Sequence, residues 1–138
     1  MKLTPASLLL IPLLCISCTA QNAAVSGPDS QLMLRQAQTR EYEDVTEHQA
    51  MRASIATLQD LDFILSKVDG DLQTLSGSKY RGGMKVNITI TVRGKGSSTV
   101  LVRANATYGQ RAIEDPDIYQ DFFCLLDKSL FLLKNQVD

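Results

Sequence analysis

The residues best suited to nucleophilic, acid–base or metal chemistry are few: three cysteines, Cys15, Cys18 and Cys124, and one histidine, His48. A zinc site or a catalytic triad needs such a residue held beside further ligands or beside a nucleophile. His48 has no second histidine and no cysteine near it in the sequence, and no catalytic motif surrounds it. We therefore expect His48 to be a helix-surface residue, and we expect no catalytic residue, no metal site and no cofactor.

The first two cysteines end an apolar segment at the N-terminus. Lys2 precedes an apolar run over residues 6–16, which is about ten residues long. A helix needs about 20 apolar residues to cross a bilayer, whereas the apolar region of a secretory signal is of this shorter length. The segment is therefore a lipoprotein signal, an ordinary secretory signal or an uncleaved anchor.

The end of this run, residues 15–18 (CISC), resembles the bacterial lipobox, in which a small residue precedes the cysteine that receives lipid. The resemblance implies cleavage between Ser17 and Cys18 and acylation of Cys18. Cys15 stands where the pattern usually has leucine, and the bulky Leu14 before it excludes Cys15 as the acylated residue. Thr19 after the cysteine, instead of aspartate, implies an outer-membrane anchor with the domain facing the periplasm.

Cys124 would be the remaining thiol of such a lipoprotein, because Cys15 leaves with the signal and Cys18 carries lipid. No internal disulfide is then expected, although the compartment is oxidising. Cys124 lies within an apolar helical pattern, and we expect its small side chain to be buried.

The composition indicates one folded domain and excludes several classes of protein. The chain has 138 residues, 44% of them hydrophobic, which argues against a disordered chain. Lys and Arg number 14 against 15 Asp and Glu, so no basic field indicates nucleic acid as a partner. We divide the chain into a signal peptide (1–17), a lipidated flexible tether (18–30) and a single α+β periplasmic domain (31–138).

Hydrophobic periodicity predicts a helix and two strands in the first half of this domain. Apolar residues at helical spacing favour a helix over 44–60, capped by Asp44 or Thr46. Residues 62–68 read as a strand, and Asp69-Gly70 predicts a hairpin that returns over 72–76. Residues 78–83 are expected to form a loop.

Strict alternation predicts a further hairpin over 84–92 and 99–108, each strand having one apolar and one polar face. The glycine-rich residues 94–98 between the strands are a turn and not a phosphate-binding loop, because no helix follows them. Asp115 and Pro116 predict the start of the last helix. The acidic residues around this start, Glu114, Asp115, Asp117 and Asp121, could suggest a calcium site or paired carboxylates, but capping and the helix dipole explain the first three.

The fold class follows from this order of elements. We predict an α+β domain, with an antiparallel sheet of about four to five strands and two helices packed on one face, in the order (β)-α-β-β-β-β-α. Basic residues cluster between the third strand and the last hairpin, either as a solvated face or as a surface for an acidic partner or lipid headgroups. The candidate interaction surface comprises Lys79, Arg81, Lys85, Arg93 and Arg103, with Lys95 nearby.

Residues 36–134 also resemble a group of small uncharacterised bacterial lipoproteins, through residues 38–42, 58–63 and 119–132. Where these proteins usually have glycine before the phenylalanine of the second segment, this chain has Asp62. The resemblance implies an envelope lipoprotein and implies no enzymatic activity. The element order is similar to that of the helix-grip domains in a lipoprotein subunit of the outer-membrane β-barrel assembly machine.

Two functions fit these observations. The first is a non-enzymatic accessory or interaction subunit of an envelope assembly or transport complex, which contacts a protein partner through the polar sheet face or an exposed strand edge. The alternative is a periplasmic carrier or sensor that binds a small apolar ligand between helices and sheet, with Phe122, Phe123 and Phe131 lining or filling the interior.

Overall fold

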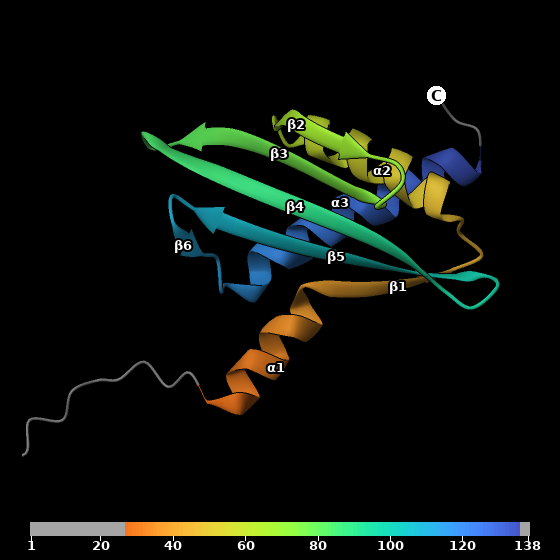
Figure 1. Ribbon diagram of the computed structural model, residues 1–138, viewed down its shortest axis with the longest axis horizontal. Helices are drawn as coiled ribbons and strands as arrows, with labels where there is room; N and C mark the ends of the chain where they lie inside the picture. The colour runs from red at the N-terminus through yellow and green to blue at the C-terminus, as the bar shows by residue number, and fades with distance from the viewer. Residues whose placement is uncertain (1–26, 136–138) are drawn as a thin grey trace, which may run out of the picture.

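The computed structural model describes residues 27–135. These residues form one antiparallel sheet, and two helices pack on one of its faces (Figure 1). The expected signal peptide, the proposed acylation site at Ser17 and Cys18, and most of the expected tether lie outside the described residues. The elements are α1 (Pro28–Ala37), β1 (Thr39–Glu43), α2 (Glu47–Asp60), β2 (Ile64–Asp69), β3 (Thr74–Arg81), β4 (Met84–Lys95), β5 (Thr99–Tyr108), β6 (Arg111–Ala112) and α3 (Pro116–Lys134). The sheet order is β1-β5-β4-β3-β2, and the short β6 pairs with the end of β5.

The α+β class and the antiparallel sheet are confirmed, whereas the number and order of the elements differ from the prediction. The structure adds β6 and the helix α1, which begins at Pro28 and therefore includes residues assigned to the tether. α1 buries none of its residues. Its apolar residues Leu32, Met33 and Leu34 are consecutive instead of recurring every three or four positions, so the sequence shows no clear helical period here.

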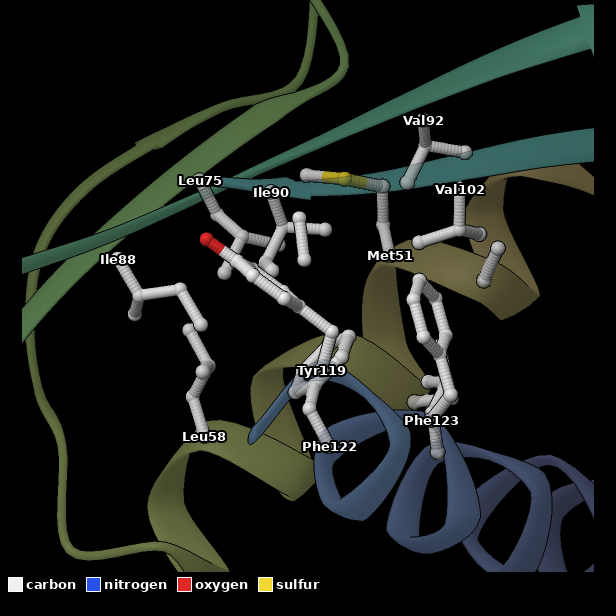
Figure 2. Close-up of a cluster of buried hydrophobic side chains, with 14 of the residues drawn as sticks. Met51, Leu58, Leu75, Ile88, Ile90, Val92, Val102, Tyr119, Phe122 and Phe123 are labelled. Atoms are coloured by element: carbon white, nitrogen blue, oxygen red, sulfur yellow. The ribbon is translucent and has the colours of Figure 1, made fainter. Parts of the chain in front are cut away.

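The predicted alternation of β4 and β5 determines where the core lies. The side chains on one face of these strands are buried beneath α2 and α3: Val86, Ile88, Ile90 and Val92 of β4, and Val100, Val102, Ala104 and Ala106 of β5. Figure 2 shows Tyr119, Phe122 and Phe123 of α3, with Met51 and Leu58 of α2, packed against this apolar face. Burial of such large apolar side chains stabilises the fold by about 1.5–3 kcal/mol each before the entropic cost of ordering them.

The buried hydroxyl of Tyr119 joins α3 to the sheet. It donates a hydrogen bond to the carbonyl of Ile113 (2.6 Å), and it accepts from the Ala106 amide (3.3 Å) and from Nε2 of Gln38 (3.1 Å). Gln38, at the junction of α1 and β1, is itself buried. One side chain therefore fixes the start of α3 against β5 and β1.

Charged side chains join β1 to α3 nearer the surface. Arg40 Nη1 pairs with the Asp127 carboxylate at 2.9 Å, and the Tyr42 hydroxyl donates to the same carboxylate at 2.8 Å. Burial raises the pKa of Tyr42 well above its usual range, and the Asp127 carboxylate raises it further. Arg40 also lies 4.9 Å from the centre of the Phe123 ring, so this arginine is fully engaged within the fold.

The β3–β4 hairpin corrects the loop expected at 78–83. β3 continues to Arg81, which pairs with Met84, and only Gly82 and Gly83 form the turn. Both have positive φ, 56° and 77°, as type I′ hairpin turns require. The hairpin expected at Asp69-Gly70 is present, but its turn spans 70–73 because Asp69 pairs with Thr74.

Both predicted helix starts have a side-chain cap, as expected. Thr46, one of the two candidates, caps α2 through a reciprocal capping box with Gln49, so the helix begins at Glu47 and not at Asp44. Asp115 caps α3 by accepting from the Asp117 amide, with Pro116 at the first helical position. The first residues of the acidic set therefore have a local structural role.

A Schellman motif ends α2 and explains the departure at Asp62. The Phe63 amide donates to the Leu58 carbonyl, and the Asp62 amide donates to the Gln59 carbonyl. This arrangement requires a residue whose backbone has the left-handed conformation, and Asp62 has the corresponding positive φ of 61°. Glycine adopts this conformation without strain.

Asp62→Gly is therefore expected to raise the free energy of unfolding by about 0.5–1 kcal/mol, because relief of left-handed strain exceeds the entropic cost of glycine. Asp62→Ala is the matched control and should lower it by a similar amount. Chemical denaturation of the three proteins measures both changes. A glycine variant less stable than the parent would show that Asp62 makes a stabilising contact that outweighs its strain.

Candidate interaction surfaces

Within residues 27–135, no element covers the face of the sheet opposite α2 and α3 (Figure 1). The side chains that point to this face from β3, β4 and β5 are mainly polar. We call this the open face. Its central residues lie in three cross-strand rows over β3, β4 and β5: Ser78, Asn87 and Thr107; Ser76, Thr89 and Asn105; Thr74, Thr91 and Arg103. Neighbouring side chains bond to each other, with 3.2 Å between the hydroxyls of Ser76 and Thr89 and 3.4 Å from Asn87 Nδ2 to Thr107 Oγ1.

Arg93 and Arg103 lie together at one end of the open face. Arg103 pairs in register with Thr91, two residues before Arg93, so the two arginines are diagonal neighbours on β4 and β5. Both are exposed, and neither forms a salt bridge in the part of the chain that the structure describes. The nearby Lys95 differs, because its ammonium group pairs with Glu41 at 2.6 Å.

The other three basic residues of the predicted surface do not lie with these arginines. Lys79 points to the helix side of the sheet, where its Nζ donates to the Leu61 carbonyl (2.7 Å) and lies 4.5 Å from the centre of the Phe63 ring. Arg81 ends the same strand, and Lys85 lies opposite Tyr80 at the far end of the open face. The five residues therefore do not form one surface, because alternate residues of β3 point to opposite faces.

A second candidate surface lies at the edge of the sheet, where β2 pairs only with β3 among the described strands. Large apolar side chains are exposed on and beside this strand: Ile64 (77%), Val68 (51%), Leu72 (68%) and Tyr80 (77%). A pocket of about 360 Å³ opens at its start, lined by Asp62, Ile64, Ser78, Lys79, Tyr80 and Arg81. We call Ile64, Val68, Leu72 and Tyr80 the β2 edge.

Sequence reasoning predicted this strand but not its exposed apolar residues. The sequence did contain an indication of them, because Ile64, Leu65 and Val68 put apolar side chains on both faces of one strand. A two-sided apolar strand usually lies at the centre of a sheet, covered on both faces. Here it lies at an edge, so some of these side chains remain in solvent.

A surface depression near residues 94–98 results from the way the hairpin packs against a helix. The turn packs beside the start of α2, and a depression of about 410 Å³ there is lined by Asp44 and Glu47 as well as by turn residues. Glu47 Oε1 accepts the Gly94 amide at 2.6 Å. The hairpin is confirmed, but its turn spans 96–98 because Gly94 and Lys95 belong to β4 and pair with β5. The acidic lining is unsuited to phosphate.

Cys124 is exposed on α3, so the prediction that it is buried is wrong. The buried residues of α3 are Tyr119, Phe122, Phe123, Leu126 and Leu130. Cys124 follows Phe123, and one further residue turns the helix by about 100°, which carries the thiol out of the buried stripe. His48 is exposed on α2, as expected.

The space between helices and sheet is filled by side chains. Phe122 and Phe123 are buried and pack edge to face, with 5.1 Å between ring centres. Phe131, expected to join them, is 65% exposed on the outer side of α3.

Within the described residues, no helix is long and apolar enough to cross a membrane.

Comparison with known proteins adds no family: no family model matches the chain, and no curated protein is detectably similar to it.

Proposed function

We propose that this chain is a membrane-anchored bacterial lipoprotein that acts, without enzymatic activity, as an accessory or interaction subunit of an envelope assembly or transport complex. The N-terminal lipobox resemblance supports an outer-membrane anchor at Cys18. The folded domain would then face the periplasm and hold its contact surface near the membrane.

The β2 edge is the observation that carries the proposed interaction. An edge strand presents unpaired backbone groups, and extended segments of other proteins bind such strands by adding to the sheet. Exposed aliphatic side chains and Tyr80 beside that edge give a partner apolar surface to bury. Aromatic residues such as Tyr80 are enriched in the centres of protein interfaces. Single exposed apolar residues are common on protein surfaces and need no partner, so it is the occurrence of several along one edge that indicates an interface.

The pocket at the start of β2 indicates the chemistry of the partner segment. Arg81 is exposed and forms no salt bridge within residues 27–135, and Lys79 lines the same pocket. Asp62 is the single acidic residue of this lining. An extended segment with an apolar residue next to a carboxylate would match Ile64 and Tyr80 on one side and Arg81 on the other.

The anchor is tested by replacing each N-terminal cysteine. Cys18→Ala is expected to abolish acylation and membrane retention, because the lipid chains supply the membrane affinity. Cys15→Ala is the matched control and should remain acylated and membrane-bound. Metabolic labelling with a fatty acid and cell fractionation measure both properties. Retention and full acylation of the Cys18→Ala protein would refute the proposed anchor.

The docking surface is tested by photocrosslinking in intact cells. A benzophenone side chain at Tyr80 is expected to capture one reproducible envelope protein, whereas the same probe at Lys128, exposed on α3, should not. Adding Val68→Lys should reduce the Tyr80 adduct several-fold, since lysine on an edge strand opposes strand addition.

Met33→Lys is the control for this substitution, because Met33 on α1 is also an exposed apolar residue (66%, against 51% for Val68). It should leave the yield of the crosslink from position 80 unchanged. The free energy of unfolding of both lysine variants should lie within about 0.5 kcal/mol of the parent's. Equal capture from Lys128, or equal loss with Met33→Lys, would exclude the β2 edge as the docking site.

A further inference from the structure

The open face differs chemically from the β2 edge. Its central rows over β3, β4 and β5 contain hydroxyl and amide side chains and Arg103. The large apolar side chains of this face lie at its margins, where Ile64 is opposite Ser78, Tyr80 is opposite Lys85 and Leu101 is opposite Arg93. Most of these side chains are half-buried by their neighbours, so they form a shallow surface with donors and acceptors held in place by the sheet. Adjacent strands place them about 4.8 Å apart across the sheet.

This composition disfavours an apolar protein surface or a bilayer as the occupant. Covering polar side chains with apolar groups would remove water without replacing its hydrogen bonds, at about 1–3 kcal/mol for each group left unpaired. A bilayer would also need several apolar side chains that insert between lipids, whereas the exposed apolar side chains of this face, Ile64 and Tyr80, lie only at the margin nearest β2. The occupant must itself carry many hydrogen-bonding groups.

Charge and shape specify this occupant further. Arg93 and Arg103 occupy one end of the open face without a salt bridge in the described chain, and guanidinium groups bind carboxylates in a bidentate manner. Lys85 and the exposed ring of Tyr80 lie opposite each other at the other end. Lys85 and Arg93 are eight residues apart on one strand, a distance of about 26 Å.

We propose that the open face binds a linear acidic polysaccharide lying along β4. Its carboxylates would pair with Arg93 and Arg103 at one end and with Lys85 at the other. Its hydroxyl groups would exchange hydrogen bonds with the central Ser, Thr and Asn side chains, and one sugar ring would stack on Tyr80. This site adjoins the β2 edge, with which it shares Tyr80, whereas Arg93 and Arg103 lie at its opposite end and belong to this site alone.

The test measures binding of the full-length lipoprotein, purified in detergent, to polygalacturonate, with neutral dextran as the comparison. The protein is expected to bind polygalacturonate and not dextran. The double variant Arg93→Gln/Arg103→Gln should weaken this binding about tenfold or more. Tyr80→Ala should weaken it by a smaller factor.

The matched control is Arg52→Gln/Lys128→Gln, which removes the same charge from exposed residues of α2 and α3. It should leave binding unchanged, as should Val68→Lys at the β2 edge, so the protein-docking site and this site can fail independently. Several results would overturn the proposal: no binding to polygalacturonate, equal binding to dextran, equal weakening by the control, or binding only to phosphatidylglycerol vesicles.

Discussion

The two-residue period of β4 and β5 is the constraint on which the rest of the fold depends. Every second side chain of these paired strands is apolar, so one face must be removed from water and the other must keep its hydrogen bonds. α2 and α3 supply the cover for the apolar face, and Tyr119 fixes α3 in place by bonding to Ala106 and Gln38. A helix layer on the second face would bury hydroxyl and amide groups without partners.

One-sided cover leaves two kinds of free surface. The open face is polar and carries unpaired arginines, whereas the β2 edge is apolar and has free backbone groups. Two other basic residues are engaged in structure, Arg40 with Asp127 and Lys79 with Phe63 and the Leu61 carbonyl. This contrast separates charges that hold the fold from charges free to meet a partner.

The sequence predicted the parts of the fold whose patterns are strong and local. Alternation located β5 over 99–108, and Asp115 with Pro116 located the start of α3. α1 was missed because its apolar residues show no clear helical period, and the end of β3 was missed because serine and glycine suggested a loop where Gly82 and Gly83 alone form the turn.

The candidate sites could be predicted only in part. The basic residues were identified by type, but the face to which each points depends on strand register, which separates Lys79 from Arg93 and Arg103. The β2 edge could not be recognised, because its apolar residues resemble those of a buried strand until the sheet order is known. Cys124 lies one residue outside a buried stripe, a difference that depends on the final position of α3.

The most direct test is the reactivity of a cysteine at Thr91, which pairs with Arg103 on the open face, in a lipoprotein that also carries Cys124→Ser. A small maleimide should label Thr91→Cys rapidly in the purified protein and several-fold more slowly in intact cells, where a ligand covers the open face. Gln120→Cys, on the exposed side of α3, should label equally well in both. Equal labelling of Thr91→Cys in both settings would contradict an occupied open face.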